Sequence, residues 1–277
     1  MKGAIIGDIV GSVYEFDNIK TKEFPLFQEQ CFFTDDTVLT VAVAGALESV
    51  LDMTDNPTLA DAPDAVVASW MQRMLLGYGR TYPGRGYGGA FHKWLAARYP
   101  KPYYSQGNGS AMRVSPVAWF ASSLEDCERL ARISAEVTHD HPDGICGAQA
   151  TAGAVYLALH GGSKEDIARY VRRYYKWDFT LDEIRPNYRF DHFAAICEGT
   201  VPHAVEAFLE STDFEDTIRN VVSIGGDTDT LGAIAGAIAE AYYGVPEELW
   251  AKAWTYLDDG MNDAVDRFYR CVEDLKA

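Results

Sequence analysis

The spacing of apolar residues constrains this chain most, because it follows the period of an α-helix in one segment after another. In residues 37–50 the apolar side chains recur every three or four positions, and Thr34 or Asp35 precedes them as a candidate N-cap. The chain offers neither a succession of alternating strands joined by hairpin turns nor a repeated strand-helix-strand pattern. The sequence therefore predicts an all-α fold.

Polar caps and glycines mark the ends of other predicted helices. Ser123 precedes a helical pattern that extends to residue 137, and Ser163 with Asp166 has the form of a capping box. Further helices are expected over residues 1–16, 145–160, 165–174, 214–222, 231–243, 246–256 and 263–275. The glycine-rich residues 77–89 are expected to be irregular, as a surface loop that either borders the functional site or lies apart from it.

Composition excludes some partners and supports a single folded unit. The chain has 24 Lys and Arg against 41 Asp and Glu, a net charge of −17. Nucleic-acid binding through the backbone needs Lys and Arg to neutralise phosphates, so nucleic acid is not an expected partner. Hydrophobic residues make up 48% of the chain and no linker or repeat divides it. We therefore expect one compact domain over residues 1–277.

The cysteines and the apolar segments indicate a cellular location. The five cysteines are odd in number and never spaced as Cys-x-x-Cys, which favours reduced thiols over a disulfide framework or a structural zinc site. The first apolar stretch is interrupted by Asp8, unlike a secretory signal, and the longest apolar runs fall short of the roughly 20 residues that cross a membrane. We expect a cytoplasmic monomer without membrane contact.

Two acidic stretches stand at predicted helix starts and are the first candidates for chemistry. One is Thr34-Asp35-Asp36-Thr37, and the other is Gly225-Gly226-Asp227-Thr228-Asp229-Thr230. A single carboxylate at a helix N-terminus is explained by capping and the helix dipole. Neighbouring carboxylates repel one another once they are desolvated, unless a proton or a cation is present. Hard oxygen donors suit Mg²⁺, Mn²⁺ or Ca²⁺, so metal binding and solvated capping loops both remain open.

Several sharper interpretations of the acidic stretches fail on their residues. The second stretch begins like a calcium-binding loop, but Ile238 occupies the twelfth position, where such a loop needs a bidentate glutamate. Neither an Asp-Thr-Gly nor a His-Glu-x-x-His segment is present. The Asp-x-Asp pattern of the second stretch also resembles the nucleophile segment of aspartate-using phosphatases. A metal-dependent phosphohydrolase therefore remains an alternative.

Three other segments carry polar groups. Residues 105–113 place small and hydrogen-bonding residues in a row, and such a loop can present backbone N–H groups to phosphate oxygens. Glu15 lies near the end of the first predicted helix. His139 lies between two others, where a capping role and a ligand-binding role are both possible. Tyr188, Phe190 and Asp191 either line an adenine pocket or pack in the core.

Taken in this order, the segments resemble the ADP-ribosylglycohydrolase family. The resemblance rests on Gly7-Asp8…Gly11…Glu15, on Thr34-Asp35-Asp36-Thr37, on Gly107-Asn108-Gly109-Ser110-Ala111-Met112-Arg113, on Thr138-His139 with Gly147-Ala148, and on residues 225–230. It implies a single orthogonal helical domain with a centre of two divalent metal ions, Mg²⁺ or Mn²⁺. It also implies a hydrolase that removes ADP-ribose from a modified protein side chain or a related conjugate.

The resemblance also assigns roles to individual residues. The implied metal ligands are Thr34, Asp35, Asp36, Asp227, Asp229 and Thr230. The implied substrate-binding residues are Glu15, Ser105, Gly107, Asn108, Gly109, Ser110, Met112 and His139. We hypothesise that Glu15, Asp35 or Asp36 moves protons while the metals act on the terminal ribose and a water near its anomeric carbon. The alternative from another class is a module that binds ADP-ribose without turnover.

Overall fold

The computed structural model of the chain describes residues 1–53 and 58–275. Within them lie fifteen helices: α1 (Lys2–Gly11), α2 (Asp35–Met53), α3 (Asp64–Thr81), α4 (Gly89–Ala96), α5 (Gly109–Met112), α6 (Pro116–Phe120), α7 (Leu124–Glu136), α8 (Pro142–Leu159), α9 (Lys164–Val171), α10 (Leu181–Ile184), α11 (Cys197–Leu209), α12 (Phe214–Ile224), α13 (Thr228–Tyr243), α14 (Glu247–Trp254) and α15 (Asp259–Asp274). The sole extended pairing in these ranges is one antiparallel bridge between Gly107 and Ile196. The all-α prediction is confirmed.

The predicted caps are present where the structure can test them. Ser123 accepts a hydrogen bond from the backbone N–H of Asp126 at the start of α7, and Ser163 and Asp166 form a capping box at the start of α9. The expectation of an irregular segment over residues 77–89 is wrong for residues 77–81, which continue α3. A β-carbon at Gly79 would lie 2.7 Å from the side chain of Leu95, so this glycine lets α4 approach α3.

Helix α11 was not predicted, because Pro202 lies inside it. A proline removes one hydrogen bond of the helix and normally interrupts the pattern. Here the neighbours of the helix compensate, since α11 packs against α8, α12 and α13 and its side chains are mostly buried. Burial of a whole helix surface therefore outweighs the local cost of one proline.

Helices α1 and α13 cross at the centre of the molecule with almost no side chain between them. A β-carbon at Gly7 would lie 1.9 Å from the carbonyl oxygen of Gly232, and one at Gly3 would lie 2.1 Å from that of Gly236. Gly11 meets the backbone of Thr228 in the same way. The three contacts follow the helices in opposite directions, so the end of α1 lies beside the start of α13.

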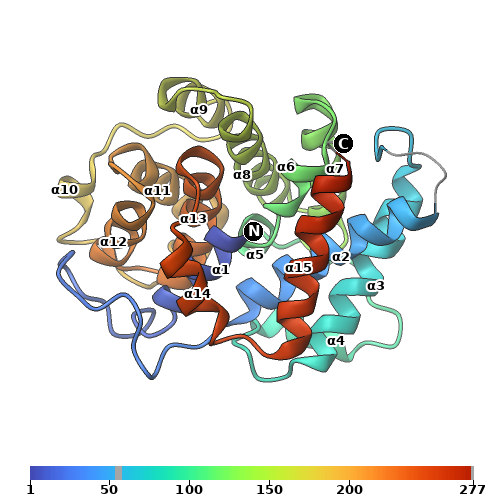
Figure 1. Ribbon diagram of the computed structural model, residues 1–277, viewed down its shortest axis with the longest axis horizontal. Coiled ribbons are helices and arrows are strands. Elements are labelled where there is room, and N and C mark those ends of the chain that lie inside the picture. Colours follow the sequence, from blue (N-terminus) through green and yellow to red (C-terminus); the bar gives the residue numbers. More distant parts are fainter. Residues whose placement is uncertain (54–57, 276–277) are drawn as a thin grey trace.

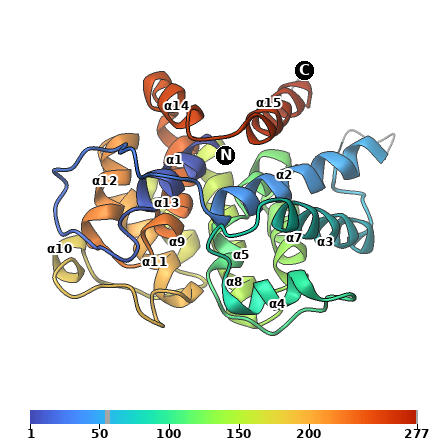
Figure 2. The same ribbon diagram turned by 90° about the horizontal axis from the view of Figure 1, so that it is seen from below.

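The other helices surround this crossing. Helices α9–α12 gather on one side of it and α2, α3 and α7 on the other, as Figure 1 shows. Figure 2 shows α14 and α15 on one face of the molecule, away from α4. Buried apolar side chains of α1, α2, α8 and α13 belong to one hydrophobic cluster. None of the helices in the described ranges is long and apolar enough to pass through a membrane.

Candidate active site

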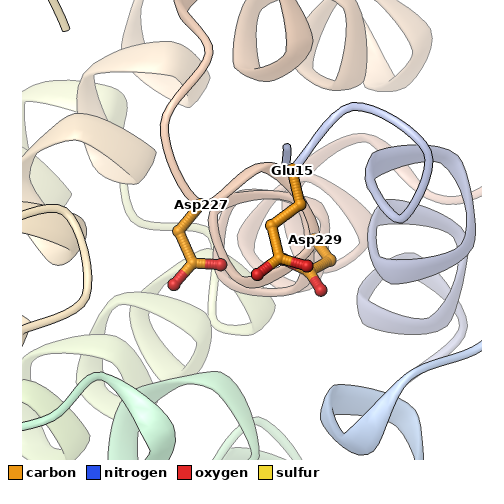
Figure 3. Close-up of side chains that lie close together, drawn as sticks. All are labelled: Glu15, Asp227 and Asp229. Atoms are coloured by element: carbon orange, nitrogen blue, oxygen red, sulfur yellow. The ribbon is translucent and has the colours of Figure 1, made fainter. Parts of the chain in front are cut away.

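The two acidic stretches meet where α1, α2 and α13 come together. The hydroxyl of Thr230 donates to Oδ2 of Asp36 at 3.4 Å, although 194 positions separate the two residues. Carboxylate oxygens of Glu15, Asp227 and Asp229 all lie within 4.8 Å of one another. Figure 3 shows these three side chains converging, Glu15 from the loop after α1 and the two aspartates from the start of α13. The geometry thus joins residues that the sequence separates widely.

The first acidic stretch is held by Asp8, which the sequence analysis did not include among the site residues. The fully buried carboxylate of Asp8 accepts the backbone N–H groups of Thr34 and Thr37 and both of their hydroxyls, with 2.7 Å to Oγ1 of Thr34. It therefore caps α2 from another helix. A buried acidic residue between apolar positions in residues 2–11 was the signal that could have revealed this role.

The second acidic stretch is held by two asparagines. Nδ2 of Asn108 donates to Oδ2 of Asp227 at 2.7 Å. Asn18 accepts the N–H of Gly226 at 2.8 Å, and its Nδ2 donates to the carbonyls of Gly226 at 3.1 Å and of Glu15 at 3.0 Å. Asn18 thereby ties the segment that carries Glu15 to the loop that begins α13. This residue was also missed, because nothing in its local sequence indicates such long-range contacts.

Burial and mutual repulsion raise the pKa of every carboxyl group in this cluster. Desolvation, and then the charges of Asp229 and Asp8, raise the pKa of Glu15 to about 8. Burial raises the pKa of Asp227 to about 6, against the opposing effect of its hydrogen bonds, and it raises those of Asp36 and Asp229 well above their ordinary range. A site that holds protons this strongly is one that a divalent cation would stabilise.

The available donor atoms fit hard divalent cations. Oδ1 of Asp36 is buried and has no hydrogen-bond partner among the described residues. The other oxygen, Oδ2, accepts from the hydroxyls of Thr34 and Thr230. No lysine or arginine forms an ion pair with Asp36, Asp227 or Asp229 in the ranges that the structure covers. Oxygen ligands of this kind are what Mg²⁺ and Mn²⁺ prefer. Thr34, Asp35, Asp36, Asp227, Asp229 and Thr230 are the residues that would hold them.

A cavity of about 490 Å³ opens above the acidic cluster. Its wall includes Glu15, the six implied metal ligands, the loop of residues 84–89 and part of the segment 103–113. The glycine-rich loop therefore borders the site, which is one of the two positions that the sequence left open for it. A β-carbon at Gly86, whose φ is +100°, would lie 3.1 Å from Oδ1 of Asp35, so this glycine brings the loop against the first acidic stretch.

Comparison with known proteins assigns the family. The model of a family described as ADP-ribosylglycohydrolase matches residues 1–275. The chain belongs to the ADP-ribosylglycohydrolase family. It is 28% identical to the mouse protein "ADP-ribosylhydrolase ARH3", over 91% of this chain and 85% of that protein. It is also 28% identical to the "ADP-ribosyl-[dinitrogen reductase] glycohydrolase" of Rhodospirillum rubrum, over 77% of this chain and 70% of that protein.

A solved structure shares the ADP-ribosylglycohydrolase fold with this chain. It is titled "ADP-ribosylglycohydrolase-related protein complex", is 26% identical in sequence and superposes with a TM-score of 0.66. The superposition covers 98% of this chain and 95% of the other. The similarity therefore extends over nearly the whole chain.

The structure brings most of the residues implied by the family resemblance to the cavity wall. Ser105, Gly107, Asn108, Gly109, Met112 and His139 all line it. Ser110 does not, because its buried hydroxyl donates to the carbonyl of Gly144 at 2.6 Å and holds α5 against α8. The side chain of Asn108 is directed to Asp227, while its backbone N–H donates to the carbonyl of Ala195.

The aromatic residues near the site separate into a buried and an exposed set. Tyr188 packs in the core, stacked on His203 with ring centroids 4.1 Å apart, and is absent from the cavity wall, as is Asp191. Phe190 does line the cavity, where its ring meets the edge of Phe16 at 5.3 Å. Phe16 is 80% exposed. Sequence alone did not indicate this, because the spacing of apolar residues does not distinguish an exposed phenylalanine from one that packs in the core.

Proposed function

We propose that this protein is a metal-dependent hydrolase that releases ADP-ribose from a modified protein side chain or a related ADP-ribosyl conjugate. The observation that carries the proposal is the meeting of Glu15 with both acidic stretches at the base of one cavity. Membership of the ADP-ribosylglycohydrolase family and the names of the relatives support the same reaction. The bond that breaks joins the acceptor to the anomeric carbon of the terminal ribose, and water supplies the replacing hydroxyl.

Two divalent ions, Mg²⁺ or Mn²⁺, would supply Lewis-acid polarisation and a more acidic bound water at this site. The protein residues bind and orient the ribose and move protons. Glu15 is half-buried and its pKa is raised to about 8, so in the metal-free protein it holds a proton at neutral pH. A protonated carboxyl group at the cavity wall is suited to protonating a leaving group. Asp35 and Asp36 are the other candidates to accept or return a proton.

The cavity wall formed by residues 105–113 would hold the nucleotide part of the substrate. The bridge between Gly107 and Ile196 fixes this segment in place, and Sγ of Cys197 donates to the carbonyl of Gly107 at 3.2 Å. Ser105 in this segment and His139 beside it present polar atoms. A rigid loop of small residues allows a diphosphate to approach the backbone closely.

We further propose that the protein works as a cytoplasmic monomer on ADP-ribosylated proteins or small conjugates. The five free cysteines support a reducing compartment. Sedimentation of the purified protein and fractionation of the source cells test the two statements separately.

The reaction itself is tested with a panel of defined ADP-ribosylated substrates. We expect release of ADP-ribose with Mg²⁺ or Mn²⁺, and at least about a 100-fold loss of kcat in EDTA and in the variants Asp35→Asn and Asp229→Asn. Asp263→Asn, at an exposed position of α15, is the matched control and should keep full activity. Unchanged activity in EDTA and in both site variants would refute the metal role.

The same panel distinguishes the two alternatives. A module that only binds ADP-ribose would give a calorimetric signal with free ADP-ribose and no product from any conjugate. A metal-dependent phosphohydrolase would release inorganic phosphate from simple phosphate esters. Either result would replace the proposed function.

A further inference from the structure

Arg113 is a buried cation at the end of the segment that lines the cavity. Its side chain is 0% exposed, and its Nη2 donates to the carbonyl of Ser134 at 2.9 Å and to Oγ1 of Thr138 at 2.8 Å. Burial lowers the pKa of Arg113 to about 10, so it stays charged at neutral pH. No carboxylate forms an ion pair with it among the described residues. Its hydrogen bond to Thr138 has a fixed direction, because a guanidinium only donates.

That direction decides what the hydroxyl of Thr138 does with its own hydrogen. Nδ1 of His139 lies 2.7 Å away, the carbonyl oxygen of Ala135 lies 3.5 Å away, and the hydroxyl of Tyr103 also interacts with this side chain. Among these, the contact to Nδ1 has the best hydrogen-bond length. If Nδ1 carried a proton, Oγ1 would accept two hydrogen bonds, and its own hydrogen would be left with the weaker contacts to Ala135 or Tyr103. Thr138 therefore donates to Nδ1, which carries no proton.

The imidazole of His139 is consequently neutral and protonated at Nε2. Burial, and then the charge of Arg113, lower the pKa of His139 well below its ordinary value. Its ring packs against Tyr103 in an edge contact, with centroids 5.4 Å apart. His139 is 6% exposed and lines the cavity. The ring N–H of His139 is therefore at Nε2, which is the ring atom nearest to a β-carbon built at Gly107 or Gly109.

The glycines opposite Nε2 leave room for a ligand atom. A β-carbon at Gly109 would lie 3.2 Å from Nε2, and one at Gly107 would lie 3.5 Å from it. No hydrogen bond to Nε2 is present within the ranges that the structure describes. The donor is therefore free to bind an oxygen atom that enters the cavity beside these glycines.

We propose that Arg113 and Thr138 are positioning residues that fix His139 as a neutral Nε2–H donor, and that this donor binds a ribose hydroxyl or phosphate oxygen of the ligand. The ligand identity rests on the proposed function, whereas the tautomer is a property of the ligand-free protein. In this role Thr138 and Arg113 act through His139, the residue whose ring they orient.

The tautomer is tested by ¹⁵N NMR of the ligand-free protein labelled at histidine. We expect the correlation pattern of the Nε2–H form for His139 in the natural protein and in Thr138→Ser, which keeps the hydroxyl. Thr138→Val keeps the shape without the donor, and there the Nδ1–H form should become populated. A natural protein in the Nδ1–H form, or a Thr138→Val spectrum identical to it, would overturn the proposal. A melting curve for each variant shows that it is folded.

The donor role is tested by calorimetry with free ADP-ribose, which requires no turnover. The amide nitrogen of glutamine reaches about as far as Nε2, and that of asparagine about as far as Nδ1. We expect His139→Gln to keep the affinity within about 5-fold and His139→Asn to lose about 10-fold or more, the cost of leaving a ligand oxygen without its donor. Equal losses in both variants would contradict the donor at Nε2.

The two tests fail separately from the proposed function. If ADP-ribose does not bind to the natural protein, the proposed function and the ligand assignment fail together, while the NMR result still decides the tautomer. If ADP-ribose binds and the conjugates are cleaved but Thr138→Val changes neither the tautomer nor the KM, only the positioning role is lost.

Discussion

Both acidic stretches of the site depend on α1, but they depend on it in different ways. The stretch at Asp227 and Asp229 is placed by backbone contact, because α13 lies against α1 through glycines on both helices. The stretch at Thr34–Asp36 is placed by a single side chain of α1, the carboxylate of Asp8. One helix therefore fixes one half of the site by shape and the other half by hydrogen bonds.

The difference indicates how each half will respond to change. A close backbone contact leaves no space for an added atom, so a side chain there would force the two helices apart and destabilise the whole fold. A hydrogen-bonded carboxylate fails by degrees, and its loss is felt first where its partners are, at Thr34 and Thr37. The predictions below separate these two kinds of support.

The largest effect is expected for Gly7→Ala. The new methyl group would lie 1.9 Å from the carbonyl oxygen of Gly232, and α1 and α13 would have to separate. We expect the free energy of unfolding to fall by more than about 3 kcal/mol, at the upper end of overpacking costs. Chemical denaturation of the purified variant measures this change.

The matched control for the helix crossing is Gly45→Ala in α2. There a β-carbon would meet the flexible methyl end of Met74 at 3.0 Å and the ring of Tyr78 at 3.9 Å, which is an ordinary contact distance. Replacing a glycine inside a helix by alanine gains up to about 1 kcal/mol of helix propensity, so this variant should be near neutral or more stable. Similar stability changes in both variants would show that the α1–α13 contact is not tight.

The contrast between shape and hydrogen bonds also explains what the sequence predicts. Apolar spacing and capping residues are local, and they were sufficient for α7, α9 and α12. Thr34 or Asp35 was expected to cap α2, and Thr34 does accept the N–H of Asp36 at 3.2 Å. The carboxylate of Asp8, which belongs to another helix, supplies a second cap that accepts the N–H groups of Thr34 and Thr37. Such a contact depends on the crossing of two helices and leaves no local pattern.

The glycines of α3 also show that a tertiary contact is not predicted by a local pattern. Residues 77–81 were expected to be irregular because glycine lowers helix propensity. In the structure Gly79 provides the space in which Leu95 packs, so tertiary contact outweighs propensity. The acidic residues of the site were predicted as a group because neighbouring carboxylates repel one another once desolvated, and the structure does bring the two stretches together. Of the residues that orient them, Asn18 carries no such signal, and Asn108 was expected to bind substrate, not to hold Asp227.

The next effect is the dependence of stability on pH, which tests the repulsion among the carboxyl groups of the two halves. Burial raises the pKa of Glu15 to about 8 and the pKa values of Asp8 and Asp227 to about 6, all above their ordinary values near 4. Between about pH 4 and pH 8 the folded state therefore binds more protons than the unfolded state, and stability falls as pH rises. Burial lowers the pKa of His139 and of His203, which opposes this trend below about pH 6.5, but these are two groups against six raised carboxyl groups in and around the acidic cluster. Carboxyl groups with lowered pKa, such as Asp64, change stability only below about pH 4.

We expect the melting temperature of the EDTA-treated protein to drop by about 5 °C or more from pH 5 to pH 8. Excess Mg²⁺ should raise it more at pH 8 than at pH 5, because the cation replaces the protons. Asp36→Asn should flatten the slope, since it removes one of the repelling groups. A melting temperature that rises over this range, or an equal effect of Mg²⁺ at both pH values, would refute this repulsion.

A smaller and more local effect is expected for Asp8→Asn. The amide has one oxygen where the carboxylate has two, so some of the four donors of Thr34 and Thr37 lose their acceptor. The turn that carries Asp36 should loosen, and Mg²⁺ affinity should fall by about 10- to 100-fold. Isothermal titration with Mg²⁺ measures it.

Asp126→Asn is the control for this loss. Asp126 is also a mostly buried carboxylate near a helix start, and it accepts hydrogen bonds from Ser122 and Arg129, remote from the cavity. Its replacement should lower the melting temperature and leave Mg²⁺ affinity unchanged. If both variants lose the same affinity, the effect of Asp8 is general destabilisation and the first half of the site does not depend on it specifically.

The smallest effect is expected for Asn108→Ala, which removes one hydrogen bond to the other half of the site. Asp227 stays at the start of α13, where the glycine contact and Asn18 still place it, so Mg²⁺ affinity at pH 8 should fall by only about 5- to 10-fold. The lost N–H donor also stabilised the charged form of Asp227, so its pKa rises and the deficit should widen as pH falls toward 6. Asn220→Ala removes a buried amide that donates to Ala207 instead and should leave the affinity intact. A larger loss for Asn108→Ala than for Asp8→Asn would reverse the comparison, because the half placed by backbone contact would then be the one that depends more on its side-chain partner.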